Sequence, residues 1–211
     1  MKIISLIKKG SNIELCFDEG SIYKLDYRSV FDNGLKKNDD ISDEKLEALL
    51  LQSEFQKTKD SALRLLARRP HSKYEIKIKL IRKGYSKDII ENVIQKLTDE
   101  KLIDDLVFSN AYVLELSEKK KSGIVKIKSQ LLKKGIDRKI IANALEKISD
   151  IEEIENAYQL VIKKLKILKR KETDHKKIQQ KLYSYLLSKG YPSELISKTL
   201  RKINLLSDEI M

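Results

Sequence analysis

The sequence predicts a mainly α-helical protein: three tandem three-helix repeats forming an elongated curved array, preceded by a small N-terminal antiparallel β-meander with a helix. Apolar residues recur at helical spacing from residue 57 onward, and one apolar pattern around a glycine occurs three times. Before residue 57, short β-branched segments alternate with turn residues. We therefore expect a β-rich extension with a linker helix over 1–56, and repeats over 57–105, 106–150 and 151–211.

The threefold repetition is clearest around the glycine that would close the second helix of each repeat. Segments 80–84, 131–135 and 186–190 all begin with leucine and end with glycine, at periods of 51 and 55 residues. Glycine is favoured there because helices commonly end in a left-handed residue. Further apolar positions match across the repeats: Ile76, Ile127 and Leu182; Ile89, Ile140 and Leu195; Ile90, Ile141 and Ile196; Ile94, Leu145 and Leu200; Leu97, Ile148 and Ile203.

Start and stop residues delimit the helices of the first repeat. The first helix, which carries the apolar residues of 62–66, is expected to end at Arg69 because Pro70 cannot continue it. Ser72, with Glu75 three residues later, predicts a capping box at the start of the second helix. Ser86 is the predicted cap of the third helix.

The later repeats carry comparable signals. In the second repeat we expect a first helix over about 108–118, a break at 122–123, and a third helix capped by Asp137. In the third repeat we expect a longer first helix over about 152–171, a cap at Thr173 or Asp174, and Pro192 at the start of the last helix.

The N-terminal segment should form three antiparallel strands over 2–8, 13–17 and 21–25, with Cys16 as a buried strand residue. Residues 26–34 predict a turn or short helix. Ser42 should open a helix that has Asp43 and Glu44 in its first turn. A single cysteine excludes an internal disulfide.

Charge is the compositional outlier, with a formal net charge of +12. Residues 1–56 hold 8 basic and 11 acidic residues, so the helical part, with the other 36 and 21, carries the whole excess. Such a surface attracts polyanions: nucleic acid, an acidic protein groove or an anionic membrane. The alternative is an ordinary solvated lysine-rich surface.

Basic side chains opposite the apolar stripe of each second helix, together with neighbouring basic runs, are the candidates for contact with a polyanion. They should form a basic stripe along the array, which would suit a filament-like partner. The candidates are Arg68, Arg69, Lys79, Arg82, Lys83, Lys119, Lys120, Lys121, Lys126, Lys133, Lys134, Lys163, Lys164 and Lys181.

No pattern of residues predicts an enzyme, a metal site or a cofactor. Asp104 and Asp105 lack a nearby third ligand and read better as the cap of the next helix. His71 and His175 lie in expected interhelical connections without a nucleophile at motif spacing. No apolar run reaches membrane-spanning length and the start lacks a signal-peptide pattern, so we expect a cytoplasmic protein without membrane association.

Several of these motifs together resemble the RecX family of bacterial recombination regulators. The likeness is carried by residues 65–69, His71 and Ser72, Glu75 and Ile76, Leu80, Gly84, 102–105 and Phe108, and it extends over 57–211. Residues 31–37 resemble the N-terminal extension of longer members. The chain departs from the family in having Ser122 and Gly123 with Lys126 where a glycine-proline-arginine stretch is usual, and lysine in place of most arginines.

The resemblance implies a non-enzymatic modulator of RecA. Such a protein binds along the groove of the RecA filament on single-stranded DNA and restrains filament growth, ATP hydrolysis and strand exchange. Two alternatives stay open: a stand-alone DNA-binding protein of helix-turn-helix type, and a scaffold for an unrelated acidic protein. The sequence leaves the oligomeric state open, and a monomer is expected.

Overall fold

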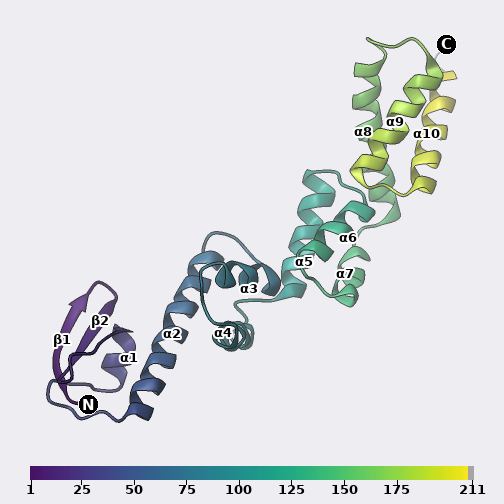
Figure 1. The fold of residues 1–211 in the computed structure, drawn as a ribbon. Coiled ribbons are helices and arrows are strands. Elements are labelled where there is room, and N and C mark those ends of the chain that lie inside the picture. Colours follow the sequence, from purple (N-terminus) through teal and green to yellow (C-terminus); the bar gives the residue numbers. More distant parts are fainter. Residues whose placement is uncertain (209–211) are drawn as a thin grey trace. The chain divides into compact units, whose positions relative to one another are not determined.

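The computed structural model describes the backbone of residues 1–208 and the side chains of residues 1–203. The chain divides into two compact units, Met1–Asp104 and Asp105–Met211. The first unit holds an antiparallel sheet and the first three-helix repeat, and the second holds the other two repeats (Figure 1). The predicted mainly α-helical fold, with three three-helix repeats after a small β-meander, is confirmed.

Three strands form the sheet: β1 (Ile3–Lys9), β2 (Asn12–Phe17) and β3 (Ile22–Asp26), in the order β1-β2-β3 with antiparallel neighbours. A short helix, α1 (Tyr27–Asp32), follows in the segment predicted to be a turn or short helix. The core of this part contains Ile3, Leu15, Phe17 and Leu25, all fully buried.

Cys16 is only half-buried, so the prediction of a buried cysteine is wrong. Successive side chains of a strand point to opposite faces of the sheet. Leu15 and Phe17 occupy the core face of β2, and Cys16 between them therefore points to the other face.

One long helix, α2 (Asp43–Leu66), connects the sheet with the first repeat. Its N-terminal half packs Leu46 and Leu49 into the cluster under the sheet. Its C-terminal half packs Ala62 and Leu65 into the core of the repeat. A single rigid helix thus belongs to both hydrophobic cores of this unit.

This helix corrects two expectations. The helix opened by Ser42 and the first helix of the repeat are one continuous element, so the expected boundary between 56 and 57 falls inside it. The helix also ends at Leu66 rather than at Arg69, because a short turn precedes Pro70. No proline or glycine interrupts 43–66, and therefore nothing in this stretch could end a helix.

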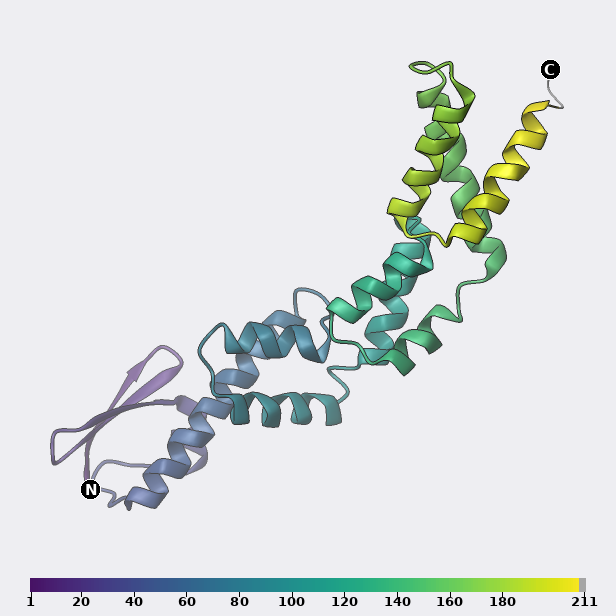
Figure 2. The same ribbon diagram turned by 45° about the vertical axis from the view of Figure 1, so that its right-hand side comes forward.

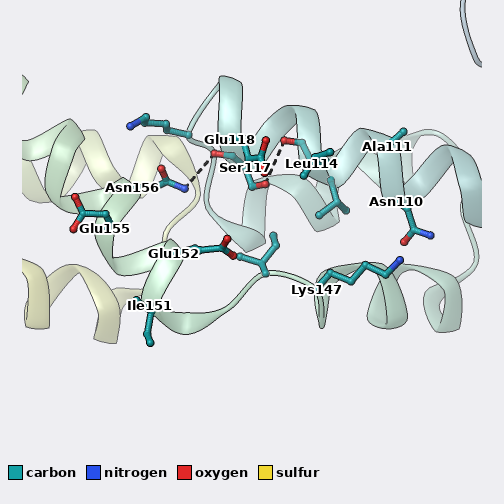
Figure 3. A pocket seen from close by; sticks show the side chains of 13 residues that line it. Asn110, Ala111, Leu114, Ser117, Glu118, Lys147, Ile151, Glu152, Glu155 and Asn156 are labelled. Atoms are coloured by element: carbon teal, nitrogen blue, oxygen red, sulfur yellow. Dashed lines mark hydrogen bonds between the residues drawn. The ribbon is translucent and has the colours of Figure 1, made fainter.

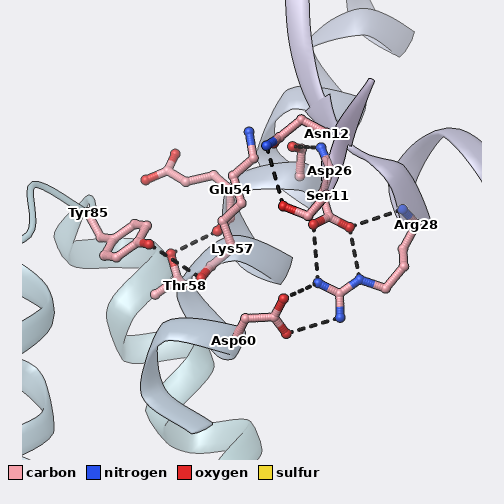
Figure 4. A network of polar contacts seen from close by, with 10 residues as sticks. Ser11, Asn12, Asp26, Arg28, Glu54, Lys57, Thr58, Asp60 and Tyr85 are labelled. Atoms are coloured by element: carbon pink, nitrogen blue, oxygen red, sulfur yellow. Dashed lines mark hydrogen bonds and ion pairs between the residues drawn. The ribbon is translucent and has the colours of Figure 1, made fainter. Parts of the chain in front are cut away.

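Polar contacts reinforce the joint between the sheet and α2 (Figure 4). Arg28 lies between Asp26, at 2.8 Å, and Asp60 of α2, at 2.5 Å. The Asp26 backbone N–H also donates to Ser53 Oγ at 2.6 Å. Burial opposes ionisation of Asp26, but its hydrogen bonds with Arg28 outweigh this effect and lower the pKa of the carboxyl. The pair is therefore fully charged at neutral pH.

The first repeat is completed by α3 (Lys73–Ile81) and α4 (Lys87–Asp99). The predicted capping box of Ser72 and Glu75 is present, and Gly84 has the expected left-handed backbone, with φ of +86°. Ser86 occupies the N-cap position of α4, but its side chain makes no capping hydrogen bond. Instead its backbone N–H donates to Glu54 Oε1 at 3.0 Å, which ties this turn to α2.

The second repeat consists of α5 (Asp105–Leu114), the π-helical turn η1 (Glu115–Lys119), α6 (Ile124–Lys133) and α7 (Arg138–Leu145). Its first helix begins three residues earlier than expected and ends in the π-helical turn, which no sequence signal indicated. The break at 122–123 and the Asp137 cap are confirmed.

The third repeat consists of α8 (Asp150–Leu168), α9 (His175–Lys189) and α10 (Ser193–Asp208), visible as three neighbouring helices in Figure 2. Asp174 caps α9 as predicted, while α8 begins and ends slightly before the expected 152–171. Pro192 lies just before α10, and its carbonyl accepts the first helical hydrogen bond, from Ile196.

The second and third repeats meet through a direct backbone contact. Gly123 N–H donates to the Lys189 carbonyl at 3.0 Å, and Val125 N–H donates to the Gly190 carbonyl at 3.1 Å. A Cβ on Gly123 would lie 2.3 Å from the Gly190 oxygen, and a Cβ on Gly190 would lie 2.2 Å from Lys126 Cβ. Neither position has room for a side chain, so glycine is needed at both. Gly190 also has a φ of +89°, which residues other than glycine rarely adopt.

Two buried polar groups complete this junction. The Glu153 carboxylate, on α8, accepts from the Ile124 N–H at 3.0 Å and so caps α6 from the other repeat. Burial raises the pKa of Glu153, and the hydrogen bond from Ile124 only partly offsets this. The Tyr191 hydroxyl donates to the Lys121 carbonyl at 2.9 Å. Packing and hydrogen bonds together hold the two repeats in one arrangement.

Alanine substitutions at two left-handed glycines should separate backbone strain from steric exclusion at the junction. Gly84→Ala meets no atom within 4 Å, so it should lower the free energy of unfolding by about 1 kcal/mol through strain alone. Gly190→Ala adds a steric clash and should lower it by about 3 kcal/mol or more. Guanidinium unfolding followed by far-UV circular dichroism measures both; equal losses would contradict a tightly packed junction.

Candidate basic interface

In the first unit, the candidate cations lie at the end of α2 and along α3. Arg68 and Arg69 occupy the turn after α2, Lys79 lies on α3, and Arg82 and Lys83 follow at its end. Arg68 and Arg82 are exposed and form no ion pair or side-chain hydrogen bond with any residue that the structure describes. They remain available to an external anion.

Arg69 has an internal role. Its guanidinium pairs with Glu75 at 3.1 Å, next to the capping box that starts α3. The same turn contains His71, which is buried and whose Nδ1 lies 2.8 Å from the Arg69 carbonyl. Burial lowers the pKa of His71, and the positive charges of Arg69 and Lys79 lower it further. The imidazole is therefore neutral at pH 7, consistent with the loop role predicted for it.

The lysine that precedes the closing glycine has an internal contact in every repeat. Lys83 Nζ donates to Ser61 Oγ on α2 at 2.6 Å. Lys134 Nζ lies 5.0 Å from the centre of the Tyr112 ring and 5.6 Å from that of Phe108. Lys189 lies 5.7 Å from the centre of the Tyr185 ring. These lysines pack along the first helix of their repeat or an aromatic neighbour, so at least part of their role is structural.

Three further candidates in the second unit also have partners. Lys120 pairs with Glu115 at 2.8 Å, and Lys181 pairs with Glu172 at 3.0 Å. The Lys121 ammonium donates to Gln159 Oε1 on α8, across the junction between the repeats. The exposed ion pairs of Lys120 and Lys181 add little stability and can be displaced by a stronger anionic partner.

Half of the predicted cations have no such partner among residues 1–203. Two of them, Lys126 and Lys133, lie seven residues apart on α6. That spacing places them on one face, about 10 Å apart along the axis. Arg68, Lys79, Arg82, Lys119, Lys126, Lys133 and Lys163 form no ion pair, side-chain hydrogen bond or ring contact with the residues whose side chains are described.

Two lysines of the third repeat contact one aromatic ring next to the junction with the second repeat. Lys126 packs directly against Gly190, the neighbour of Lys189 in the chain. Lys189 and Lys164 lie 5.7 Å and 5.3 Å from the centre of the half-buried Tyr185 ring. We call Lys126, Lys164, Lys189 and Tyr185 the junction cluster. It combines positive charge with an aromatic ring, as nucleic-acid-binding surfaces commonly do.

Lys189 was absent from the predicted candidates. A signal was present, because Lys83, Lys134 and Lys189 occupy the same position before the repeated glycine. Helical spacing alone could not place it next to Lys126, since that proximity depends on the contact between two repeats.

The exposed lysine and arginine side chains of the helical repeats can bind anions noncovalently. Within the part of the chain that the structure describes, no group of three or more His, Cys, Asp or Glu side chains could hold a metal ion. Over the same residues, no helix is both long and apolar enough to cross a bilayer. Exposed ammonium and guanidinium groups can bind phosphates or carboxylates electrostatically.

Comparison with family models matches all three repeats. The model described as "RecX, first three-helix domain" matches residues 59–97, the one for the second domain matches 104–145, and the one for the third matches 150–200. These ranges follow the three repeats found in the structure.

Curated relatives align over nearly the whole chain. A "Regulatory protein RecX" of Clostridium perfringens (strain 13 / Type A) is 31% identical, over 95% of this chain and 94% of its own. That of Clostridium acetobutylicum is 32% identical, over 96% and 94%. These alignments include most of the N-terminal β-rich segment as well as the repeats.

Two solved structures have the same fold. "Crystal structure of RecX from Lactobacillus salivarius" is 28% identical and superposes with a TM-score of 0.66, over 72% of this chain and 97% of that one. "Crystal structure of regulatory protein RecX" is 20% identical, with a TM-score of 0.75 over 95% and 98%, and supports the fold alone.

The low pKa of His71 predicts a pH dependence of stability. The pKa of the His71 imidazole is near 6.5 in the unfolded chain and lower in the folded chain. At pH values between these two pKa values, the unfolded chain binds more protons than the folded chain. Stability contributed by neutral His71 is thus full above pH 6.5 and is lost as the pH falls toward the folded pKa. His71→Asn, which keeps a donor for the Arg69 carbonyl, should lose this component. Melting temperatures of both proteins from pH 7.5 to 5.5 provide the test; parallel curves would contradict it.

Proposed function

This chain belongs to the RecX family of regulatory proteins, and we propose that it is a regulator of RecA. The proposal is supported by the three family models, by relatives named as regulatory proteins over more than nine-tenths of their length, and by the shared fold. We propose further that it acts without catalysis, as a monomer that binds RecA on single-stranded DNA.

In detail, we propose that the chain binds along the groove of the RecA–single-stranded DNA filament. There it would limit filament growth, ATP hydrolysis and strand exchange, mainly as an inhibitor. The observation that carries this mechanism is the set of cations without internal partners, above all Lys126 and Lys133 on one face of α6. Because they need not break an internal ion pair, their interaction with a phosphate or carboxylate is not opposed by that loss.

The second helices of the first two repeats supply the same kind of contact. Lys79 and Arg82 in the first repeat, like Lys133 in the second, lie on or at the end of the helix whose opposite side is buried. A helix anchored on one side by fully buried residues such as Leu80 and Leu131 presents its basic side chains on a rigid support.

A double substitution on α6 tests the proposal. Lys126→Gln with Lys133→Gln should weaken inhibition of the single-stranded-DNA-dependent ATPase of RecA by about five-fold or more. If both lysines contact phosphate, the slope of log affinity against log salt should fall by roughly 1.4. Filament binding at several salt concentrations and ATPase titrations measure these changes.

A matched control removes two charges elsewhere. Lys36→Gln with Lys37→Gln affects exposed residues of the N-terminal unit that are not candidates. This variant should inhibit RecA as the wild type does. Equal loss in both double variants would show that net charge alone matters, and no loss in the α6 variant would exclude its face from the interface.

The stand-alone DNA-binding alternative makes a different prediction for the same proteins. Three helices with a turn can enter a DNA groove, and binding of that type needs no RecA. Fluorescence anisotropy with several duplexes at two salt concentrations would show tight, sequence-selective binding if this alternative were correct. Weak, non-selective binding together with strong dependence on RecA supports the regulator.

A further inference from the structure

A groove lies within the second unit, between α5 with η1 on one side and the start of α8 on the other (Figure 3). Its volume is about 640 Å³, within the range of small binding sites. The apolar side chains that line it include Val113, Leu114, Ile148 and Ile151. None of the fourteen predicted cations lines it except Lys121.

Large apolar side chains at this groove are unusually open to water. Ile151 is 80% exposed and Leu114 is 55% exposed, although each has buried neighbours in the same helical region. A contiguous exposed apolar surface in a folded chain commonly marks a site that another molecule covers. Burying these two side chains would give a binding partner hydrophobic free energy.

The charges around the groove differ from those of the rest of the helical region. Three carboxylates line it, Glu118, Glu152 and Glu155, against two lysines, Lys121 and Lys147. The Lys121 ammonium is already engaged by Gln159. A region whose sequence is strongly basic therefore has a groove in which carboxylates outnumber lysines by one, which disfavours a nucleic-acid backbone and favours a cationic partner.

Asn110 provides a further polar group in the groove. Its Oδ1 is shielded from water and accepts no hydrogen bond from the residues that the structure describes. Figure 3 shows its amide on the side of the groove that Lys147 borders. An unpaired buried acceptor is unfavourable, so this amide is a point of unsatisfied polarity in the wall of the groove.

The walls of the groove are held in place. Asn156 Nδ2, on α8, donates to the Ser117 carbonyl in η1 at 3.3 Å, a bond drawn in Figure 3. The π-helical turn that contains Ser117 and Glu118 is a form that often occurs at functional sites. Because the junction glycines also fix the two repeats, the groove is formed before any partner arrives.

We infer that this groove binds a protein segment in which a large aliphatic side chain lies next to a lysine or arginine, and that RecA supplies the segment. The aliphatic side chain would pack on Leu114 and Ile151, and the cation would lie near Glu118. The choice of RecA rests on the proposed function. A second copy of this chain is disfavoured as the occupant, since two chains of net charge +12 repel each other.

Two substitutions test the inference on the full chain. Ile151→Ser removes the exposed apolar contact, and Glu118→Lys reverses the charge that would hold the cation. Each should weaken binding to RecA-coated single-stranded DNA by about five-fold or more, the effect of losing one significant interface contact. Binding to the bare strand should be unchanged for Ile151→Ser, and unchanged or tighter for Glu118→Lys. Fluorescence anisotropy with one labelled oligonucleotide, with and without RecA, compares both targets.

Matched controls make the same chemical changes outside the groove. Ile167→Ser alters another exposed isoleucine of α8, and Asp32→Lys makes the same charge reversal on α1. Both controls should bind RecA-coated DNA as the wild type does.

The outcomes distinguish this inference from the proposed function. If the wild type does not bind RecA-coated DNA, the proposed function and the groove's assignment to RecA are both wrong. If the wild type binds and the two groove variants bind equally well, or lose bare-DNA affinity in parallel, only the groove assignment is wrong. If sedimentation shows a dimer that Ile151→Ser dissociates, a second copy occupies the groove and the inference is overturned.

Discussion

The contact between Gly123 and Gly190 is the constraint on which the second unit depends. At this point two backbones approach so closely that neither glycine has room for a Cβ. The approach allows two hydrogen bonds between the repeats and brings Lys126 next to Lys189. It also brings α8 beside η1, where Glu153 caps α6 and Asn156 binds the Ser117 carbonyl. The position of Lys126 beside the other residues of the junction cluster and the acidic groove both follow from this one packing event.

In the first unit, the core under the sheet and the core of the first repeat are joined in another way. Here a continuous helix, α2, contributes apolar residues to both, and small polar residues along it allow close approach by neighbouring elements. Ser53, Thr58 and Ser61 are all buried. Ser53 accepts from the Asp26 backbone, and Ser61 accepts from Lys83. Since helical residues advance by a fixed rise and rotation, α2 places the sheet and the repeat rigidly with respect to each other.

Local requirements made most of the fold predictable from sequence, whereas contacts between distant residues did not. The glycines at 84, 135 and 190 all have positive φ, because the end of each second helix imposes that geometry locally. The continuity of α2 was missed because buried Thr58 and Ser61 interrupt its apolar pattern without breaking the helix. The burial of Glu153 was equally unpredictable, since an acid in a first helical turn normally faces water and its partner lies 29 residues away.

The same distinction applies to the basic residues. Charge and helical spacing selected fourteen candidates, but Arg69, Lys83 and Lys121 contact residues that no spacing rule connects with them. A cation that already has a neutral or anionic neighbour must exchange one interaction for another when it binds, and its net contribution is small. A cation without such a neighbour exchanges only water and counterions, whose release favours association with a polyanion. Internal pairing therefore divides a surface of similar lysines into residues that support the fold and residues free to act on a partner.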